Sequence, residues 1–504
     1  MVVRHPAAVV ALGTLALHSF VSRSYGYFRD ELYYLACTEH LDLGYVDHPP
    51  LSIWLLWVVR NTLGDSLPAL RLVPAIAGAM TVWLTGAMAK RLGGGRFAQL
   101  LAALAVAIGP GHLAVTNFYS MNAIDLLVWA AALYMFIDTV ERPSPRRWAI
   151  LGVVLGLGLL NKVSVLWLGA GMATALLLTR HRTLLLTPGP WIAALVTTVL
   201  FVPHVVWQVR HGWPTLEFVR NATELKMVEV SPLQFLADQV MMTHPFAFPV
   251  WVIGLWWLLA GPERRRWSYL AWTFLTPFAL LLASGTSRAY YLGPAYPPLF
   301  AAGAVAIAGA VARPGFSRAR TAMASLMLAG GVVTAPLALP LLSVERHIAY
   351  SQRLGVAPRS EEKTEVGLLP QHLADMFGWP ELVQAVAKVH RQLPEHERAN
   401  ASIYTDNYGR AGAVDFFGGG YGLPRAISGH NSYFLWGPRG ATGEIMIIIG
   451  GTLEDHLPDF DDVRRAAVVH CRYCMPYEDG VVIYVGRRLK TPLDVLWPQV
   501  KKYI

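Results

Sequence analysis

The chain has 504 residues, of which 54% are hydrophobic and only 15% charged, and its formal net charge is +9 at pH 7. A soluble domain usually has about a quarter of its residues charged, and the mean hydropathy here is +0.40. These values exclude an ordinary soluble protein. They predict a polytopic α-helical membrane protein, with the lipid bilayer as its first partner.

The basic residues lie in short hydrophilic breaks between apolar segments. They are Lys90, Arg91 and Arg96; Arg142, Arg146 and Arg147; Arg180 and Arg182; Arg264, Arg265 and Arg266; and Arg313, Arg318 and Arg320, together with Arg4. Cytoplasmic loops of membrane proteins carry such an excess of Lys and Arg. The positive charge therefore predicts the cytoplasmic side of the membrane, and we expect no nucleic-acid partner.

Eleven apolar segments are predicted to cross the membrane as helices, since most are long enough for a hydrocarbon core of ~30 Å. They are 6–22, 66–89, 97–114, 122–139, 148–161, 163–179, 190–208, 245–261, 267–284, 293–312 and 321–342. With a cytoplasmic N-terminus, this count leaves every basic break inside. No small-x-small cleavage site follows the first segment, so we do not predict a cleavable signal.

The segment Leu51–Val59 is apolar but short for a crossing, and counting it as one would place Lys90 and Arg91 outside. We predict an interfacial or re-entrant helix that begins at Pro49-Pro50, because proline suits a first helical turn. The breaks on the outer side are then 23–65, 115–121, 209–244 and 285–292, together with a tight turn near Lys162.

The first outer loop carries acids that a simple connection does not need. Asp30 and Glu31 precede Leu32–Leu35, which reads as the start of an amphipathic helix along the interface. Asp47 and His48 close the same loop and could return to the first pair. For a random loop, ordinary solvated charges would be the expected interpretation.

Two cations lie on the predicted outer side, against the positive-inside trend. Lys162 interrupts an apolar hairpin, and Arg288 precedes Tyr290 and Tyr291 in an outer turn. A lysine at a helix end can simply extend to the headgroups, and tyrosines are common in the aromatic belt. Alternatively, Lys162 and Arg288 could clamp one lipid-linked phosphate from two loops.

Residues 343–504 are more polar and predict a small α/β domain outside the cytoplasm. Helices are expected at Glu381–Leu393 and Leu493–Trp497, and strands at Ala401–Tyr404, Glu444–Ile449, Ala466–Val469 and Val481–Val485. Cys471 and Cys474 could pair there, but three cysteines cannot form a disulfide framework. The Gly418–Gly422 run lacks the context of a nucleotide loop, and the histidines show no metal-ligand spacing.

The motifs together resemble a known family. "RDELYY", "YVDHPPL", the lysine hairpin and "YYLGPAYPPL" resemble the integral-membrane glycosyltransferases of the protein O-mannosyltransferase and aminoarabinose-transferase type, glycosyltransferase family 39. "DMFGWPELV" and "YGLPRAISGHNSYFLWGP" resemble a bacterial branch with an added C-terminal domain. The likeness covers nearly the whole chain, and the ordered combination is far more specific than any single motif.

The resemblance implies a GT-C-type fold in a bacterial inner membrane, with a transmembrane domain at 1–342 and an extracytoplasmic domain at 343–504. It implies a polyprenyl-phosphate sugar donor and inverting transfer on the extracytoplasmic face. By position, Asp30 matches the catalytic acidic residue of the family and Glu31 its neighbour, so both are catalytic candidates. His48 lies in the family's His/Lys-Pro-Pro element, Lys162 matches the lysine hairpin, and Tyr290 and Tyr291 match the tyrosine–leucine–proline turn. Arg29 and Asp47 are further site candidates beside them.

One motif departs from the family. Where many relatives have aspartate in a second outer turn, this chain has Asn122, with Asp125 three residues later. The roles of both residues are therefore open. No cofactor is expected to be required, and a divalent metal such as Mg or Mn remains possible without being indicated.

The chemistry fits these residues. A carboxylate such as Asp30 can take the proton of an acceptor hydroxyl, and cations can stabilise the charge on a leaving lipid phosphate. The sequence identifies neither the sugar nor the acceptor, which could be a glycan, a lipid or a protein. The alternatives are a transporter and a membrane-anchored binding or sensing protein. A transporter would have ionisable residues near the bilayer midplane and two related halves, and the sequence shows neither. A binding or sensing protein would leave the acids of the first loop unexplained.

Overall fold

The computed structural model describes residues 5–312 and 315–504 and contains two compact units. The helical unit comprises Met1–Arg23, Ser66–Val206 and Glu229–Ser343. The mixed unit comprises Ser24–Asp65, Trp207–Val228 and Val344–Ile504. The predicted first outer loop therefore belongs to the same compact unit as the C-terminal segment.

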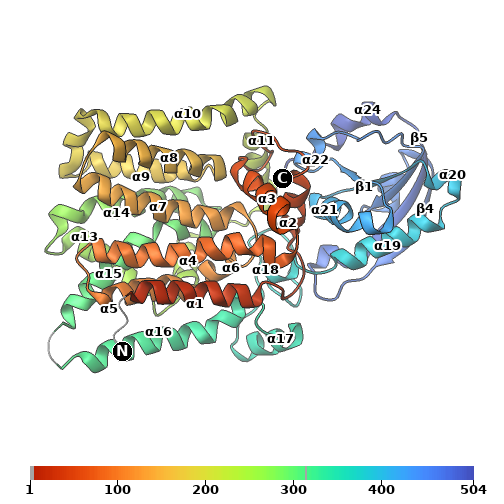
Figure 1. The fold of residues 1–504 in the computed structure, drawn as a ribbon. Helices are drawn as coiled ribbons and strands as arrows, with labels where there is room; N and C mark the ends of the chain where they lie inside the picture. The colour runs from red at the N-terminus through yellow and green to blue at the C-terminus, as the bar shows by residue number, and fades with distance from the viewer. Residues whose placement is uncertain (1–4, 313–314) are drawn as a thin grey trace. The chain divides into compact units, whose positions relative to one another are not determined.

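The helical unit consists of helices joined by short turns (Figure 1). In chain order they are α1 (Pro6–Val21), α4 (Leu67–Arg91), α5 (Arg96–Ala107), α6 (Pro110–Val115), α7 (Met121–Glu141), α8 (Pro145–Asn161), α9 (Val165–Leu177), α10 (Pro188–Arg210), α12 (Pro232–Thr243), α13 (Phe248–Ala260), α14 (Arg264–Ser284), α15 (Pro297–Ala310) and α16 (Ser317–Ala338), with 3₁₀ turns η1 (Arg180–Leu186) and η3 (Ala289–Ala295). Several begin at a proline, whose fixed φ suits the first turn.

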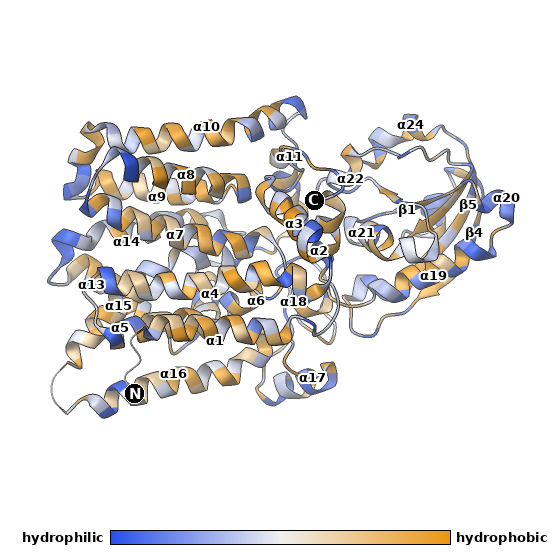
Figure 2. Cartoon of the chain, viewed as in Figure 1, coloured by the Kyte–Doolittle hydropathy of each residue, from blue (hydrophilic) through white to orange (hydrophobic). Residues whose placement is uncertain are grey.

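Among the described residues, five helices are long and apolar enough to cross a membrane alone: α4, α7, α10, α14 and α16. The count rises to seven if the bent pairs α12–α13 and η3–α15 each form one span. Figure 2 shows hydrophobic residues along these helices and hydrophilic residues concentrated in the turns. The chain therefore has the helices of a multi-spanning membrane protein, while the count of eleven crossings stays a prediction.

Each of the eleven predicted segments contains a helix, but their lengths differ from the prediction. Segment 97–114 is divided into α5 and α6, because Gly109 is extended and Pro110 begins a new helix. In the same way, segment 293–312 begins in the 3₁₀ turn η3 and becomes α-helical only from the double proline at Pro297-Pro298. Proline thus divides apolar runs that hydropathy alone joins.

Three of the predicted cytoplasmic breaks meet at one end of the helical unit. Asp138 near the end of α7 pairs with Arg91 at 2.8 Å and with Arg147 at 2.9 Å. Glu141 in the same turn pairs with Arg266 at the start of α14. These ion pairs place the three basic breaks at the same end of the helical unit, and the side of the membrane on which that end lies stays a prediction.

The mixed unit contains a five-stranded sheet in the order β2-β1-β3-β5-β4. The strands are β1 (Ala401–Thr405), β2 (Ala426–Ser428), β3 (Ile445–Ile449), β4 (Phe460–Val469) and β5 (Val481–Leu489). β1 pairs in parallel with β2 and β3, and β5 pairs antiparallel with β3 and β4. The central β3 is buried along its whole length, which explains its run of isoleucines.

Helices surround this sheet and complete the unit. They are α2 (Arg29–Cys37), α3 (Leu51–Leu63), α11 (Pro214–Asn221), α17 (Val344–Arg353), α18 (Gln371–Ala374), α19 (Trp379–Gln392), α20 (Glu395–Arg398), α21 (Tyr408–Phe417), α22 (Ser432–Leu435), α23 (Leu453–His456) and α24 (Leu493–Leu496), with the single-turn helices η2 (Ala222–Lys226), η4 (Gly418–Tyr421), η5 (Pro476–Glu478) and η6 (Trp497–Val500). The predicted C-terminal α/β character is confirmed; β2 and α21 were not predicted.

The first loop forms two helices, α2 and α3. The predicted helix after the double proline is confirmed, because α3 begins directly after Pro50. The amphipathic interpretation of Leu32–Leu35 is wrong, since these four side chains are at most 3% exposed. They are buried because α2 packs against α21 and α3 within the mixed unit.

Candidate functional site

The two neighbouring acids of the first loop have different surroundings. Glu31 is fully buried, and its carboxylate accepts a hydrogen bond of 2.8 Å from the backbone N–H of Phe28. This contact closes the first turn of α2, where orphan N–H groups need acceptors. Asp30 remains 31% exposed, and its Oδ1 accepts a hydrogen bond of 3.0 Å from the Tyr408 hydroxyl.

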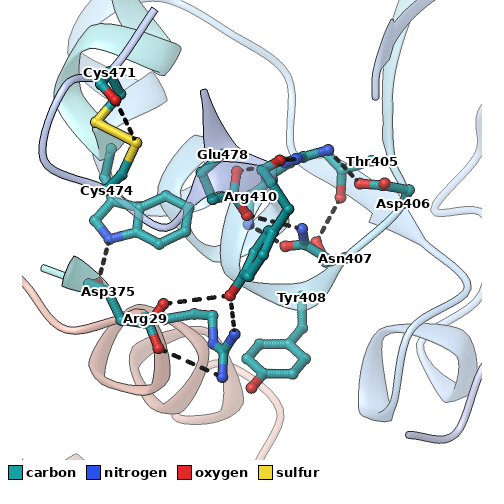
Figure 3. Close-up of polar contacts among 12 residues, drawn as sticks. Arg29, Asp375, Thr405, Asp406, Asn407, Tyr408, Arg410, Cys471, Cys474 and Glu478 are labelled. Carbon is teal, nitrogen blue, oxygen red and sulfur yellow. Dashed lines mark hydrogen bonds and ion pairs between the residues drawn. A yellow bond between two sulfur atoms is a disulfide. The ribbon is translucent and has the colours of Figure 1, made fainter. Parts of the chain in front are cut away.

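Arg29 connects α2 to the C-terminal segment of the same unit (Figure 3). Its guanidinium donates a hydrogen bond of 2.7 Å to the Tyr477 hydroxyl and lies 3.6 Å from the Asp375 carboxylate. It also lies 3.7 Å from Asp30. Burial raises the pKa of Asp375 to about 7, and the positive charge of Arg29 acts against that shift.

Asp47 lies close to this cluster through a second phenol. The Tyr33 hydroxyl donates a hydrogen bond of 2.8 Å to Asp47 Oδ1, and the Tyr33 ring lies 4.7 Å from the Tyr408 ring. Burial raises the pKa of Asp47, and the nearby negative charge of Asp30 adds to the shift. The structure therefore gathers two acids, Asp30 and Asp47, around a pair of packed tyrosines.

His48 is fully buried among aromatic rings. Its ring lies 4.6 Å from Tyr34 and 4.9 Å from Tyr45, and its Nδ1 is 2.9 Å from the carbonyl oxygen of Pro49. Its Nε2 lies 4.0 Å from the Asp47 carboxylate, too far for a hydrogen bond. This environment is typical of a residue that shapes the double-proline turn.

The helical unit holds the second group of candidates around Lys162. α8 ends at Asn161, and the Lys162 ammonium donates a hydrogen bond of 2.8 Å to the side-chain oxygen of Asn122. It lies 3.8 Å from the Asp125 carboxylate, which itself accepts a hydrogen bond of 2.9 Å from Ser164. Asn122 and Asp125, where this chain departs from the family motif, therefore both contact Lys162.

Aromatic rings from η3 cover the same lysine. The Lys162 ammonium lies 4.9 Å from the ring centre of Tyr291 and 5.8 Å from that of Tyr290, within the range of cation–π attraction. The Arg288 guanidinium donates a hydrogen bond of 3.3 Å to the Tyr290 hydroxyl. The lysine hairpin and the arginine–tyrosine turn therefore lie in contact within the helical unit, while the clamping of a phosphate by Lys162 and Arg288 stays a prediction.

A pocket within the helical unit is lined by this lysine. It encloses about 580 Å³ of empty space, counting the part open to solvent. Its polar lining includes Lys162, Asn122, Asp125 and Tyr290, whereas residues such as Leu126 and Phe300 make much of the wall apolar. A cation in a largely apolar pocket suits an anionic group attached to a hydrocarbon chain.

The described residues contain no group of three His, Cys, Asp or Glu side chains placed to hold a metal ion. Cys471 and Cys474 form a disulfide in the mixed unit (Figure 3). Sequence reasoning missed three residues that contact the predicted candidates. Tyr408 contacts Asp30, Tyr33 contacts Asp47, and Asp375 contacts Arg29. Asp375 lies in the "DMFGWPELV" motif, which was the one signal that could have drawn attention to it.

Comparison with known proteins gives a partial match to a family model and similarity to several glycosyltransferases. Residues 47–207 match the family model described as dolichyl-phosphate-mannose-protein mannosyltransferase. Lipid A galacturonosyltransferase RgtD of Rhizobium johnstonii is 24% identical over 269 residues, which are 52% of this chain and 56% of that protein. Undecaprenyl phosphate-alpha-4-amino-4-deoxy-L-arabinose arabinosyl transferase 1 of Pseudomonas fluorescens is 24% identical over 263 residues, 49% of this chain and 40% of that protein. The aligned regions thus span about half the length of these curated relatives.

Two solved structures share the fold. ArnT from Cupriavidus metallidurans, bound to undecaprenyl phosphate, matches with a TM-score of 0.62 at 13% identity, over 95% of this chain and 97% of that one. The archaeal oligosaccharyltransferase AglB from Archaeoglobus fulgidus matches with a TM-score of 0.50 at 13% identity, over 80% and 63%. The resemblance that the motifs predicted is therefore confirmed, and the chain has a GT-C-type fold like that of these two proteins.

Proposed function

We propose that this protein is a glycosyltransferase that transfers a sugar from a polyprenyl-phosphate donor to an acceptor hydroxyl. Transfer would occur on the extracytoplasmic face of a bacterial inner membrane, with the N-terminus cytoplasmic and the C-terminal domain outside. The relatives' names support this proposal, because one acts on lipid A and another uses an undecaprenyl-phosphate sugar. The acceptor is a hydroxyl of a glycan, a lipid or a protein.

The observation that carries the proposal is the pocket containing Lys162. A polyprenyl phosphate combines an anionic head with a long hydrocarbon chain, and this pocket combines a held ammonium group with an apolar wall. Asn122 and Asp125 fix the ammonium position through contacts of 2.8 and 3.8 Å. The Cupriavidus protein with the same fold was solved with undecaprenyl phosphate bound, which supports the same class of ligand here.

The leaving group explains why cations are needed. When the bond between the sugar and the phosphate breaks, negative charge grows on the phosphate oxygen. A preplaced cation stabilises that charge without reorganising during the reaction. In our proposal Lys162 does this with Arg288, while Tyr290 and Tyr291 hold the two cations in place.

Asp30 is the general base in this proposal. An acceptor hydroxyl is a weak nucleophile at neutral pH, so a carboxylate within hydrogen-bond reach accelerates attack by taking its proton. Asp30 is 31% exposed and therefore accessible, whereas Glu31 is buried and hydrogen-bonded to the backbone of its own helix. We therefore assign the proton transfer to Asp30 and the shaping of α2 to Glu31.

The stereochemical outcome follows from a single displacement. The hydroxyl oxygen attacks the anomeric carbon as the phosphate leaves from the opposite side, and the hydroxyl proton passes to Asp30. No covalent sugar–enzyme intermediate is needed, so the configuration at the anomeric carbon is inverted. The scheme requires no cofactor, and no step in it depends on a metal ion.

Binding of the lipid phosphate tests the pocket directly. Undecaprenyl phosphate is titrated into the protein in nanodiscs, and wild type is compared with Lys162→Ala. Loss of a charge-assisted hydrogen bond typically costs about 1.5–3 kcal/mol, so we expect the dissociation constant to rise by roughly 10- to 100-fold.

The matched control is Lys388→Ala, which removes an exposed lysine from α19 of the mixed unit. Its affinity for undecaprenyl phosphate should equal that of wild type. If Lys162→Ala binds as tightly as wild type, or if wild type does not bind the lipid phosphate, the pocket is not the donor site.

A further inference from the structure

Asp30 has a partner that is distant in the sequence. The Tyr408 hydroxyl donates a hydrogen bond of 3.0 Å to Asp30 Oδ1, across a separation of 378 residues. Asp30 belongs to α2 of the first loop, and Tyr408 is the first residue of α21 in the C-terminal segment. Both lie in the mixed unit, so the C-terminal segment contacts the proposed base directly.

The backbone around Tyr408 is held firmly by polar contacts. Asn407 caps α21 by accepting a hydrogen bond of 2.9 Å from the N–H of Arg410. Asn407 also donates to Glu478 at 3.2 Å, and Arg410 donates to the same carboxylate at 2.8 Å (Figure 3). Tyr408 therefore projects from a helix end whose position is fixed on two sides.

The Tyr408 ring is placed between the first-loop side chains. It packs against the Tyr33 ring at 4.7 Å, and the Arg29 guanidinium lies 5.5 Å from its centre. Burial raises the pKa of Tyr408 well above that of an exposed tyrosine. The hydroxyl therefore keeps its proton near neutral pH and can donate it in a hydrogen bond to a carboxylate.

Two glycines allow α21 to approach α2 this closely. A Cβ atom at Gly412 would lie 2.8 Å from the backbone carbonyl carbon of Leu32, and one at Gly409 would lie 2.6 Å from Cγ of Arg29. Any larger residue would push the helices apart. The Tyr408–Asp30 contact thus depends on the spacing of two packed helices as well as on one hydroxyl.

We propose that Tyr408 is a positioning residue for Asp30, supplied by the C-terminal segment, and that it holds one carboxylate oxygen so that the carboxylate is oriented toward the acceptor hydroxyl. This inference rests on the proposed function of Asp30. It gives the C-terminal segment a defined part in the reaction. Because Tyr408 acts through Asp30, its loss should reduce turnover and leave the binding of the donor unchanged.

The test compares Tyr408→Phe with Tyr404→Phe in a transfer assay. The protein in lipid nanodiscs receives a panel of radiolabelled undecaprenyl-phosphate sugars, with bacterial membrane extract as acceptor. Tyr408→Phe keeps the ring packing and removes only the hydroxyl. We expect kcat to fall at least about tenfold, in line with the loss of a hydrogen bond to a charged group, with the donor KM within about twofold of wild type. Tyr404→Phe, which removes a phenol from β1, should keep the wild-type kcat.

A second pair of variants tests the helix spacing. Gly412→Ala introduces a Cβ into the α2–α21 contact, whereas Gly419→Ala introduces one into open space. We expect Gly412→Ala to lower kcat and Gly419→Ala to leave it unchanged. Adding Tyr408→Phe to Gly412→Ala should cause little further loss, because both changes remove the same contact.

The outcomes separate the two proposals. If Asp30→Asn is inactive and Tyr408→Phe keeps the wild-type kcat, the positioning role is wrong while the proposed function stands. A Tyr408→Phe variant that changes KM alone would also contradict it. If wild type transfers no sugar, or if Asp30→Asn transfers as well as wild type, the role proposed for Asp30 is wrong and the positioning role is wrong with it.

Discussion

At the scale of single residues, local structure separates side chains that the sequence presents as equals. Asp30 and Glu31 are adjacent acids in one motif, yet Glu31 is buried against the backbone of Phe28 and Asp30 is partly exposed. The sequence identified Asn122 and Asp125 as candidate residues, because the chain departs from the family motif there. It did not predict that both contact Lys162. Tyr408 was not identified, because nothing local links it to a residue 378 positions earlier.

The buried Asp375 predicts a pH dependence of stability. Its pKa rises from 3.8 to about 7 on burial, so the folded protein binds a proton over a range in which the unfolded chain has released it. The stabilisation is fully present below about pH 3.8 and is lost as the pH rises through about 7. We expect the unfolding free energy of wild type, relative to Asp375→Asn, to fall by up to about 4 kcal/mol across this window.

The measurement is the thermal unfolding midpoint of wild type and Asp375→Asn from pH 4.5 to 8. Other groups titrate in this range, so the difference between the two proteins is the informative quantity. Parallel curves, with a constant difference at every pH, would show that Asp375 does not keep its proton on folding.

At the scale of elements, long apolar runs were predictable, and short or glycine-rich elements were not. Every predicted crossing contains a helix because hydrophobic length alone specifies it. β2 has only three residues, and α21 contains Gly409 and Gly412, which are unfavourable in a helix. Tertiary packing forms both elements: β2 pairs with β1, and α21 packs closely against α2.

The Cys471–Cys474 disulfide makes a separate prediction about the mixed unit. It closes a loop of four residues, for which the chain-entropy relation gives about 2 kcal/mol of stabilisation. For a unit of this size, reduction should lower the unfolding midpoint by roughly 4–8 °C. The measurement is thermal unfolding with and without dithiothreitol.

The double variant Cys471→Ser, Cys474→Ser is the control. It should unfold at the temperature of reduced wild type and should not respond to the reductant. An unfolding midpoint of wild type that does not change after both thiols are shown to be free would contradict the stabilising role.

At the scale of the whole molecule, composition predicted a membrane protein and the ordered motifs predicted its fold. Hydropathy could not predict that residues 24–65 fold with residues 344–504, because that grouping depends on contacts such as Arg29 with Tyr477 and Tyr408 with Asp30. The grouping also bears on the alternative of a binding or sensing protein. Such a protein would need only its C-terminal segment, yet Tyr408 of that segment donates a hydrogen bond to Asp30 of the first loop.

Above all, we propose that this protein transfers a lipid-linked sugar with Asp30 as the base. The most direct measurement is transfer of label from undecaprenyl-phosphate sugars into membrane acceptors by purified wild type, Asp30→Asn and Asp42→Asn in lipid. Asp42 is an exposed acid of the same loop and serves as the matched control. We predict that wild type and Asp42→Asn transfer the sugar and that Asp30→Asn is at least about 100-fold slower. Full activity of folded Asp30→Asn would contradict the account.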